Sequence, residues 1–178
     1  MTGLDVNANS ILQISCFITD YQLNLLDVEG WGAIVHHDKA ILDKMDEWCT
    51  RTHASTGLTS AAIASSTTAE EAAHDLLNYI EKYVPEPRTA LLAGNSVHAD
   101  KVFLSLPPYN KILEHLHYRI LDVSTIKEAV RRWAPREIVE MIPEKKNLHE
   151  AREDILESIE EARFYQKTFF ERRSSGLV

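Results

Sequence analysis

The order of apolar and polar residues predicts a β-hairpin in the first part of the chain. The segment SILQISCFITD, residues 10–20, is rich in β-forming Ile, Phe and Thr. The polar stretch YQLNLLDVEG follows and is predicted to reverse the chain direction. WGAIVHH, residues 31–37, is then the predicted returning strand.

Apolar residues at helical spacing predict two helices before residue 90. The first is expected to be capped by Asp38 and to run through KAILDKMDEWC, until THASTGLTS ends it. The second is expected to begin at Thr68, with Glu71 three residues later completing a capping box. Pro85 is expected to end it.

The second half of the chain alternates between strands and helices. RTALLAG is predicted as a strand that ends at Gly94, with a helix from about Asp100 that two prolines interrupt. YRILDV is predicted as the next strand, and Ser124 as the N-cap of the helix TIKEAVRRW. A long final helix is expected from about Glu150, and residues 171–178 are expected to be a disordered tail. This order predicts a single α/β domain over residues 1–170, with a mixed sheet covered by helices.

Composition narrows the class of protein. The 178 residues are 44% hydrophobic, enough for the core of one domain, and no run of eighteen apolar residues predicts a membrane span. Two cysteines make no disulfide framework, which favours an intracellular, reducing location. A net charge of −8 argues against a protein that binds long nucleic acid by counterion release, but it leaves open a short nucleotide substrate held through metal ions.

The final predicted helix carries the first candidate site. Asp154 lies about 60° around the helix axis from the apolar Ala151, at the border of the core-facing stripe. A carboxylate there can be partly desolvated and still reach a cleft. His149 could converge with Asp154 only if it lies on the loop before the helix. A solvated acidic helix with an N-terminal histidine is the alternative.

The end of the strand LLAG carries a second candidate site. Ligands of α/β proteins gather at the carboxyl ends of strands, and Asn95 and Ser96 follow this strand directly. Together with free backbone N–H groups they could hold a phosphate, with Asp100 nearby. An ordinary aspartate that stabilises a helix start is the alternative.

Two further stretches carry polar groups suited to nucleotides. Arg119 and the pair Ser124–Thr125 flank the strand YRILDV, and hydroxyls at a helix start beside an arginine can bind an anion. Their alternative roles are a surface residue and a simple N-cap. Trp48, with His53 five residues later, could form a stacking wall for a base, although a core position is the default for this tryptophan.

Several motifs in the same order resemble the oligoribonucleases, specifically the eukaryotic branch. They are MTGLD, DEWC-RTH, LAGNSVHADK, HLHYRILDVST-KE--RRW-P and H-A--DI-ESI-E-R-Y, and they extend from Met1 to about Phe170. The resemblance implies a ribonuclease-H-like fold in the DEDD group of 3′→5′ exonucleases. It implies release of mononucleotides from very short RNAs, above all dinucleotides, by a homodimer.

The resemblance also assigns catalytic roles. It implies hydrolysis with two Mg²⁺ or Mn²⁺ ions, which prefer oxygen ligands. Asp100 and Asp154 are implied as the second and last of four metal-binding acids. His149 is implied as the general base that takes a proton from the attacking water.

Further positions are implied to bind the substrate. Leu4, Trp48 and His53 would contact the bases. The 5′ phosphate would be held by Ser96, Arg119 and Ser124, with Tyr118 from the partner subunit. A mitochondrial or cytoplasmic location is expected, with no membrane and no long duplex nucleic acid as partner.

One family motif has no counterpart in this sequence. The Asp-x-Glu that supplies the other two acids would lie on a strand directly before Met1. We therefore expect an N-terminally truncated domain that lacks the central first strand, and a loss of activity of several orders of magnitude. The alternatives are a catalytically dead paralogue that binds short RNA or pairs with an active subunit, and a DNA-directed exonuclease of the same superfamily.

Overall fold

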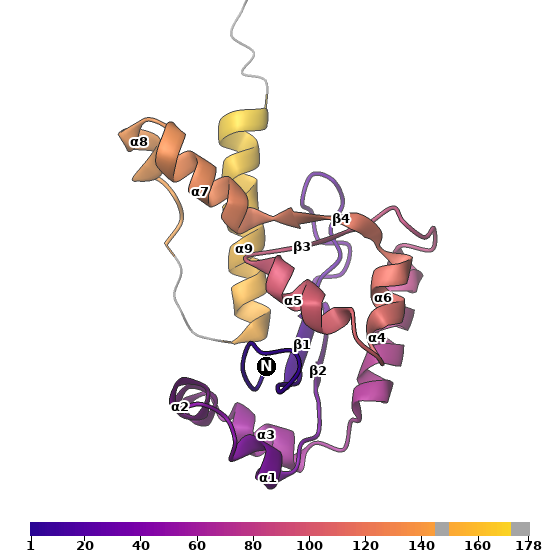
Figure 1. Ribbon diagram of the computed structural model, residues 1–178. Coiled ribbons are helices and arrows are strands. Elements are labelled where there is room, and N and C mark those ends of the chain that lie inside the picture. The colour runs from indigo at the N-terminus through magenta and orange to yellow at the C-terminus, as the bar shows by residue number, and fades with distance from the viewer. Residues whose placement is uncertain (145–149, 172–178) are drawn as a thin grey trace, which may run out of the picture.

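The computed structural model describes residues 1–144 and 150–171. Figure 1 shows strands and helices mixed along the chain, so the predicted α/β class is confirmed. The described strands form two sheets of two strands each, β1–β2 and β3–β4. Within the described residues, no strand of one sheet pairs with a strand of the other. The strand predicted before Met1 lies outside this sequence and stays a prediction.

The predicted hairpin is confirmed. Strands β1 (Gln13–Cys16) and β2 (Trp31–Ile34) pair antiparallel, with Gln13 opposite Ile34 and Cys16 opposite Trp31. The loop between them returns through Gly30, whose φ of +66° is one that residues with a side chain rarely adopt. A Cβ on Gly30 would lie 2.6 Å from the Phe17 ring, so this position requires glycine.

The helix predicted to be capped by Asp38 is divided in the structure. Helix α1 covers only Lys39–Leu42, and α2 covers Glu47–Ser55. The division occurs because the Asp46 carboxylate accepts a hydrogen bond of 2.7 Å from the Cys49 N–H and caps a new helix there. Asp38 makes no side-chain cap. The short helix α3 (Leu58–Ala64) follows.

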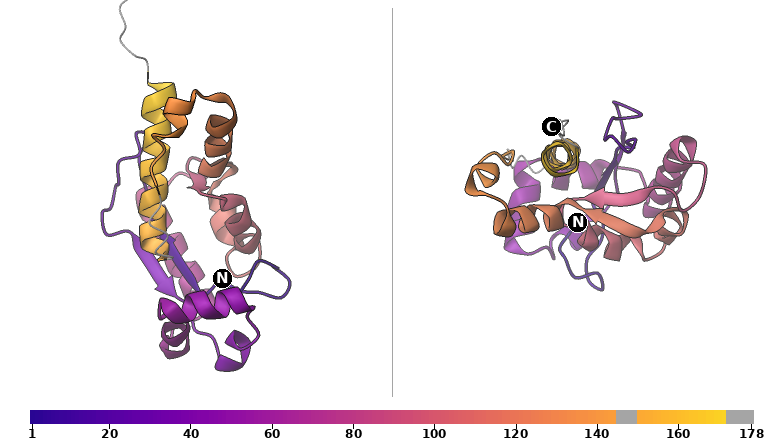
Figure 2. Two further views of the ribbon diagram at one scale, coloured as in Figure 1. Left: turned by 90° about the vertical axis from the view of Figure 1, so that its left-hand side faces the viewer. Right: turned by 90° about the horizontal axis from the view of Figure 1, so that it is seen from above.

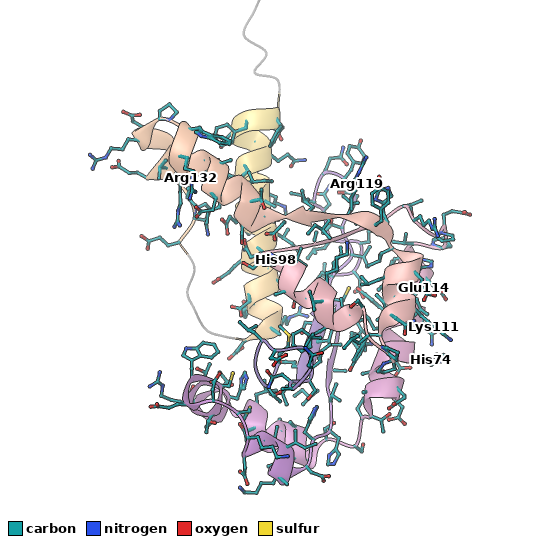
Figure 3. The ribbon with its side chains drawn as sticks, in the orientation of Figure 1. His74, His98, Lys111, Glu114, Arg119 and Arg132 are labelled. Atoms are coloured by element: carbon teal, nitrogen blue, oxygen red, sulfur yellow. The ribbon has the colours of Figure 1, made fainter. Side chains whose placement is uncertain are left out.

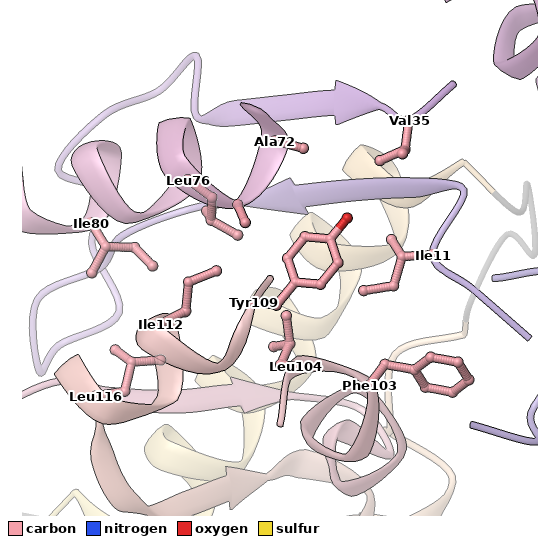
Figure 4. Packing of buried hydrophobic residues seen from close by; sticks show 11 residues of the cluster. Ile11, Val35, Ala72, Leu76, Ile80, Phe103, Leu104, Tyr109, Ile112 and Leu116 are labelled. Carbon is pink, nitrogen blue, oxygen red and sulfur yellow. The ribbon is translucent and has the colours of Figure 1, made fainter. Parts of the chain in front are cut away.

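Helix α4 (Ala69–Tyr83) begins as predicted. Thr68 and Glu71 form the reciprocal hydrogen bonds of a capping box, so that prediction is confirmed. The apolar face of α4 packs into the main core, where it meets residues of the hairpin and of α5 and α6, as Figure 4 shows. The buried members of this core are Ile11, Val35, Ala72, Ala73, Leu76, Ile80, Phe103, Leu104, Tyr109, Ile112 and Leu116.

Strands β3 (Leu91–Gly94) and β4 (His117–Asp122) lie parallel, with Gly94 opposite Asp122. The connection between them contains α5 (Val97–Leu104) and α6 (Asn110–His115), separated at Pro107–Pro108 as predicted. Helix α5 begins three residues earlier than the prediction from Asp100, because its N-cap is Ser96.

Three helices complete the described fold. Helix α7 (Val123–Trp133) stops before Pro135 as predicted, and α8 (Arg136–Val139) follows it. Helix α9 (Ala151–Tyr165) continues into a π-helical turn, η1 (Gln166–Phe170). Seen from above, α9 stands end-on beside the strands (Figure 2), and it contacts β1, β3 and α7. A second, smaller core lies between α7 and α9 around Val123, Val130, Ala162 and Tyr165.

Candidate active site

The first part of the candidate site lies where β3 and β4 end side by side. Because these strands are parallel and Gly94 pairs with Asp122, the residues that follow them meet at one edge. Asn95 and Ser96 follow β3, and Ser124 lies in the first turn of α7. Figure 3 shows His98 at the start of α5, close to this edge. The structure thus brings Asn95, Ser96 and Ser124 together at this edge.

Hydrogen bonds join these side chains into one cluster. The Ser124 hydroxyl donates to the Asn95 carbonyl oxygen at 3.2 Å and accepts from the Ser96 N–H at 2.9 Å. The hydroxyl oxygens of Ser96 and Ser124 are 3.3 Å apart. Ser96 has a left-handed backbone with φ +54°, which turns the chain sharply from strand into helix. We call Asn95, Ser96 and Ser124 the serine cluster.

Asp122 occupies the backbone donors that the sequence suggested were free for a phosphate. Its Oδ1 accepts from the N–H groups of Ser96 and Ser124, each at 3.0 Å, so Asp122 and not Ser124 is the N-cap of α7. Its Oδ2 lies 3.0 Å from His98 Nδ1. Burial raises the pKa of Asp122, but the hydrogen bonds from His98, Ser124 and Ser96 outweigh it and leave the pKa lowered. Both N–H groups are therefore used, and neither is free to bind an anion.

Asp100 lies one turn further along α5, with its side chain exposed. Desolvation raises the pKa of Asp100, and a hydrogen bond from the backbone opposes that effect in part. Asp154 is half-buried in the first turn of α9. His149 lies outside the described residues.

The donor chemistry of Asp100 and Asp154 fits a hard divalent cation, because both offer carboxylate oxygens. The described residues nevertheless bring no three His, Cys, Asp or Glu side chains together as a metal-binding group. Within residues 1–144 and 150–171 the ligand set of a two-metal site is therefore incomplete.

The predicted base-binding residues lie around the start of the chain. His53 Nε2 lies 2.9 Å from the Met1 carbonyl oxygen, which identifies Nε2 as the protonated nitrogen. Desolvation lowers the pKa of His53, only partly offset by that hydrogen bond, so the ring is neutral near pH 7. Leu4 is 79% exposed and Trp48 53% exposed. The default core position for Trp48 is wrong, and both apolar side chains face solvent.

The remaining predicted substrate residues are exposed. The Arg119 guanidinium lies over the Tyr118 ring, with its carbon 5.3 Å from the ring centre, and Tyr118 stacks on His117. Figure 3 shows Arg119 on β4, away from the start of α7. Among the described residues the Arg119 side chain forms no hydrogen bond with the serine cluster. Thr125 lines a hollow together with His98, Asp122 and Ile126.

Two residues that organise this edge were not predicted from the sequence. Asp122 is the last residue of an apolar strand and comes directly before a helix. Aspartate is a common N-cap at such a position, and this signal could have identified it. Glu161 is only 1% exposed, on a helix where neighbouring glutamates suggested a solvated face. Its partners Lys127 and Asn95 come from distant parts of the chain, so no local pattern could have identified it.

Comparison with known proteins identifies the family. The model of the exonuclease family matches residues 1–162. The mitochondrial oligoribonuclease of Bos taurus is 44% identical over 98% of this chain and 72% of its own length. The probable oligoribonuclease of Schizosaccharomyces pombe is 45% identical over 93% of this chain and 64% of its own length, and the oligoribonuclease of Nocardia farcinica is 42% identical over 96% and 77%. The chain belongs to the exonuclease family and, within it, to the oligoribonucleases.

This membership confirms the predicted class of enzyme, a hydrolytic exoribonuclease. Enzymes of the exonuclease family generally use divalent metal ions. None of the described helices has the length and apolar character that a membrane crossing requires. Three of the relatives, from Bos taurus, Mus musculus and Homo sapiens, are mitochondrial by name.

Proposed function

We propose that this chain hydrolyses very short oligoribonucleotides, dinucleotides above all, from the 3′ end to mononucleotides. The observation that carries the proposal is the serine cluster at the joined ends of β3 and β4, one helical turn from Asp100. In a 5′-phosphorylated dinucleotide, the first nucleoside carries one phosphate on its 5′ side and one on its 3′ side. The serine cluster could bind the first phosphate while a metal ion at Asp100 binds the second. The relatives named oligoribonuclease support this choice of substrate. The catalytic unit is proposed to be a single domain over residues 1–170.

The 5′ phosphate is proposed to bind at the serine cluster. Asp122 already binds the N–H groups of Ser96 and Ser124, so the donors would be the hydroxyls of Ser96 and Thr125, with Arg119 supplying the positive charge. Ser124 would hold the Ser96 backbone in place through its oxygen. The negative charge of Asp122 would repel a phosphate, so the positive charge of Arg119 has to offset that repulsion. In a homodimer, Tyr118 of one subunit would close the other subunit's site, as its exposure permits.

Leu4, Trp48 and His53 are proposed to hold the bases. The exposure of Leu4 and Trp48 supports this role, because an apolar side chain must be accessible to stack on a base. His53 is neutral and already donates to the Met1 carbonyl, so it would position Met1 and its neighbours under the bases.

Asp100 and Asp154 are proposed to bind Mg²⁺ or Mn²⁺. When bound, the ions would polarise the scissile phosphate and stabilise the charge that develops on it. His149 is proposed as the general base that accepts the proton of the attacking water. We further propose a mitochondrial or cytoplasmic location, in line with the mitochondrial relatives.

The test is cleavage of a 5′-phosphorylated diribonucleotide in Mn²⁺, with products separated by chromatography. We expect two mononucleotides per substrate, at the strongly reduced rate expected without the acids of the Asp-x-Glu motif, and no cleavage of the matching deoxyribonucleotide. Asp100→Asn should abolish turnover, whereas Asp43→Asn, which removes an exposed aspartate paired with Lys39, should not change it. Binding without turnover by the unsubstituted chain would overturn the proposal in favour of a catalytically dead paralogue. Equal cleavage of the deoxyribonucleotide would overturn the choice of RNA.

A further inference from the structure

Helix α9 carries a buried carboxylate that the proposed chemistry does not use. Glu161 is 1% exposed, and its carboxylate has three partners from three different elements. The Lys127 ammonium lies 2.8 Å from Oε1, and the Tyr165 hydroxyl donates to the same oxygen at 2.8 Å. The Asn95 amide nitrogen donates to Oε2 at 3.2 Å. A buried charge persists only when it is paired and hydrogen-bonded, and each of these contacts satisfies it.

The contact with Asn95 connects this carboxylate to the serine cluster. An asparagine amide has a donor side and an acceptor side, and Glu161 can only accept. Glu161 therefore holds the Asn95 nitrogen toward α9, where it also contacts the Ser158 hydroxyl at 2.8 Å. The Asn95 oxygen must then face the opposite way, and it accepts the hydrogen of the Ser124 hydroxyl at 3.2 Å.

The direction of that hydrogen decides what the serine cluster offers a ligand. With its hydrogen directed at Asn95, the Ser124 oxygen is an acceptor for the Ser96 N–H, which fixes the start of α5 against the start of α7. In the contact of 3.3 Å between the two hydroxyl oxygens, Ser96 is then the donor. Because the Ser96 side chain is exposed and its hydroxyl can rotate, it can give this hydrogen to a ligand instead. If the Asn95 amide were reversed, its nitrogen would donate to Ser124 and this order of donors would be lost.

Lys127 also helps to hold the serine cluster in place, through its ion pair with Glu161. It lies one turn after Ser124 on α7, so its ion pair with Glu161 fixes that helix against α9. Two elements of the serine cluster, the end of β3 and the start of α7, are thus attached to one carboxylate. The structure brings β3, α7 and α9 into mutual contact at this point.

We propose that Glu161 is a positioning residue, which through Asn95 sets the hydroxyl orientation of the serine cluster for a terminal phosphate. This inference rests on the proposed role of that cluster as the site of the 5′ phosphate. It predicts that Glu161 determines preference for a phosphorylated end while it touches no substrate.

The experiment measures binding of 5′-phosphorylated and 5′-hydroxyl diribonucleotides by titration in EDTA, where no metal supports turnover. The unsubstituted chain should prefer the phosphorylated form. Glu161→Gln can present either face of its amide to Asn95, so we expect it to reduce that preference about tenfold, the equivalent of one well-placed hydrogen bond. Affinity for the 5′-hydroxyl form should change less than about twofold.

Two further variants separate positioning from simple stabilisation. Tyr165→Phe removes a hydrogen bond from Oε1 but leaves the contact of Oε2 with Asn95, so it should lower the melting temperature without changing the preference. Asn95→Ala should reduce the preference as Glu161→Gln does, and the double variant should add nothing to it. Asn95→Ala also provides the test should Glu161→Gln fail to fold, because it leaves the Lys127–Glu161 ion pair intact.

The outcomes distinguish the inference from the proposed function. A preference retained in full by Glu161→Gln, or additive effects in the double variant, would overturn the positioning role and leave the phosphate site standing. Equal binding of both dinucleotides by the unsubstituted chain would instead show that the serine cluster is no phosphate site, and the inference would fall with it.

Discussion

The two ends of the proposed substrate site are built on opposite principles. At the serine cluster, side chains from β3, α7 and α9 are joined by hydrogen bonds that lead to the buried Glu161. At the proposed base-binding end, Leu4 and Trp48 are exposed to solvent, and His53 donates a hydrogen bond to the Met1 carbonyl. The first end consists of polar side chains that hydrogen bonds hold in place, whereas the second presents exposed apolar surface on which a base could stack. Substitutions should therefore cost folding stability at one end and mainly affinity at the other.

The largest effect is expected for Glu161→Ala. It leaves the Lys127 ammonium unpaired beside the core, so the free energy of unfolding should fall by about 3 kcal/mol. Urea denaturation measures this loss. The neighbouring Glu160→Ala is the matched control, because Glu160 is exposed and its surface pair with Arg163 contributes at most about 0.5 kcal/mol. Equal losses for the two variants would contradict the idea of an ordered end.

Arg119→Ala is expected to have the next largest effect, on activity and not on folding. The guanidinium is exposed, so its loss should leave the unfolding free energy unchanged. A lost charge-assisted contact to phosphate is worth about 2 kcal/mol, which should lower kcat/KM for a 5′-phosphorylated dinucleotide about 30-fold. Arg136→Ala, which removes an exposed arginine paired with Glu140, is the control. A similar loss on the 5′-hydroxyl substrate would show that Arg119 does not bind the phosphate.

The contrast between the two ends also explains what could be predicted from the sequence. The hairpin, the capping box of α4 and the strand ends were predictable, because periodicity and capping are local. The position of Asn95 and Ser96 at the end of β3 was predictable from the rule for strand ends. The exposure of Trp48 was not predictable. Apolar residues at helical spacing show that a helix has an apolar face, but not whether another part of the chain packs against that face.

The division of α1 from α2 and the burial of Glu161 were unpredictable for different reasons. Asp46 follows several helix-forming residues, and only its hydrogen bond to Cys49 shows that it caps a new helix. Glu161 is stabilised by Lys127 and Asn95, which lie 34 and 66 residues away along the chain (161 − 127 and 161 − 95). No local pattern contains such partners, so a glutamate on an acidic helix is expected to face water.

Trp48→Ala should have a smaller effect than Arg119→Ala. Stacking of one base on an aromatic ring is worth about 1–3 kcal/mol, and a half-exposed ring lies at the lower end, so we expect KM to rise about tenfold for both the 5′-phosphorylated and the 5′-hydroxyl dinucleotide. Steady-state kinetics on the two substrates measures this. Trp133→Ala is the control, since Trp133 is 82% exposed on α7. A rise confined to the phosphorylated substrate would contradict separate roles for the two ends.

The smallest effect is expected for the pH dependence of His53. Desolvation lowers its pKa in the folded chain, whereas the unfolded chain keeps the ordinary value near 6.5, so the unfolded state binds more protons as the pH falls through 6.5. The contribution of His53 is therefore fully present above pH 6.5 and decreases as the pH falls toward the folded pKa.

His53→Gln keeps a side-chain donor for the Met1 carbonyl but cannot titrate. Its unfolding free energy should consequently fall less than that of the unsubstituted chain between pH 7 and 5, as denaturation at each pH would measure. Other titrating groups, Asp100 among them, cancel in the difference between the two proteins. A His53→Gln curve parallel to the original would mean that His53 is as well solvated as in the unfolded chain. The contact between His53 and the Met1 carbonyl would then be open to water.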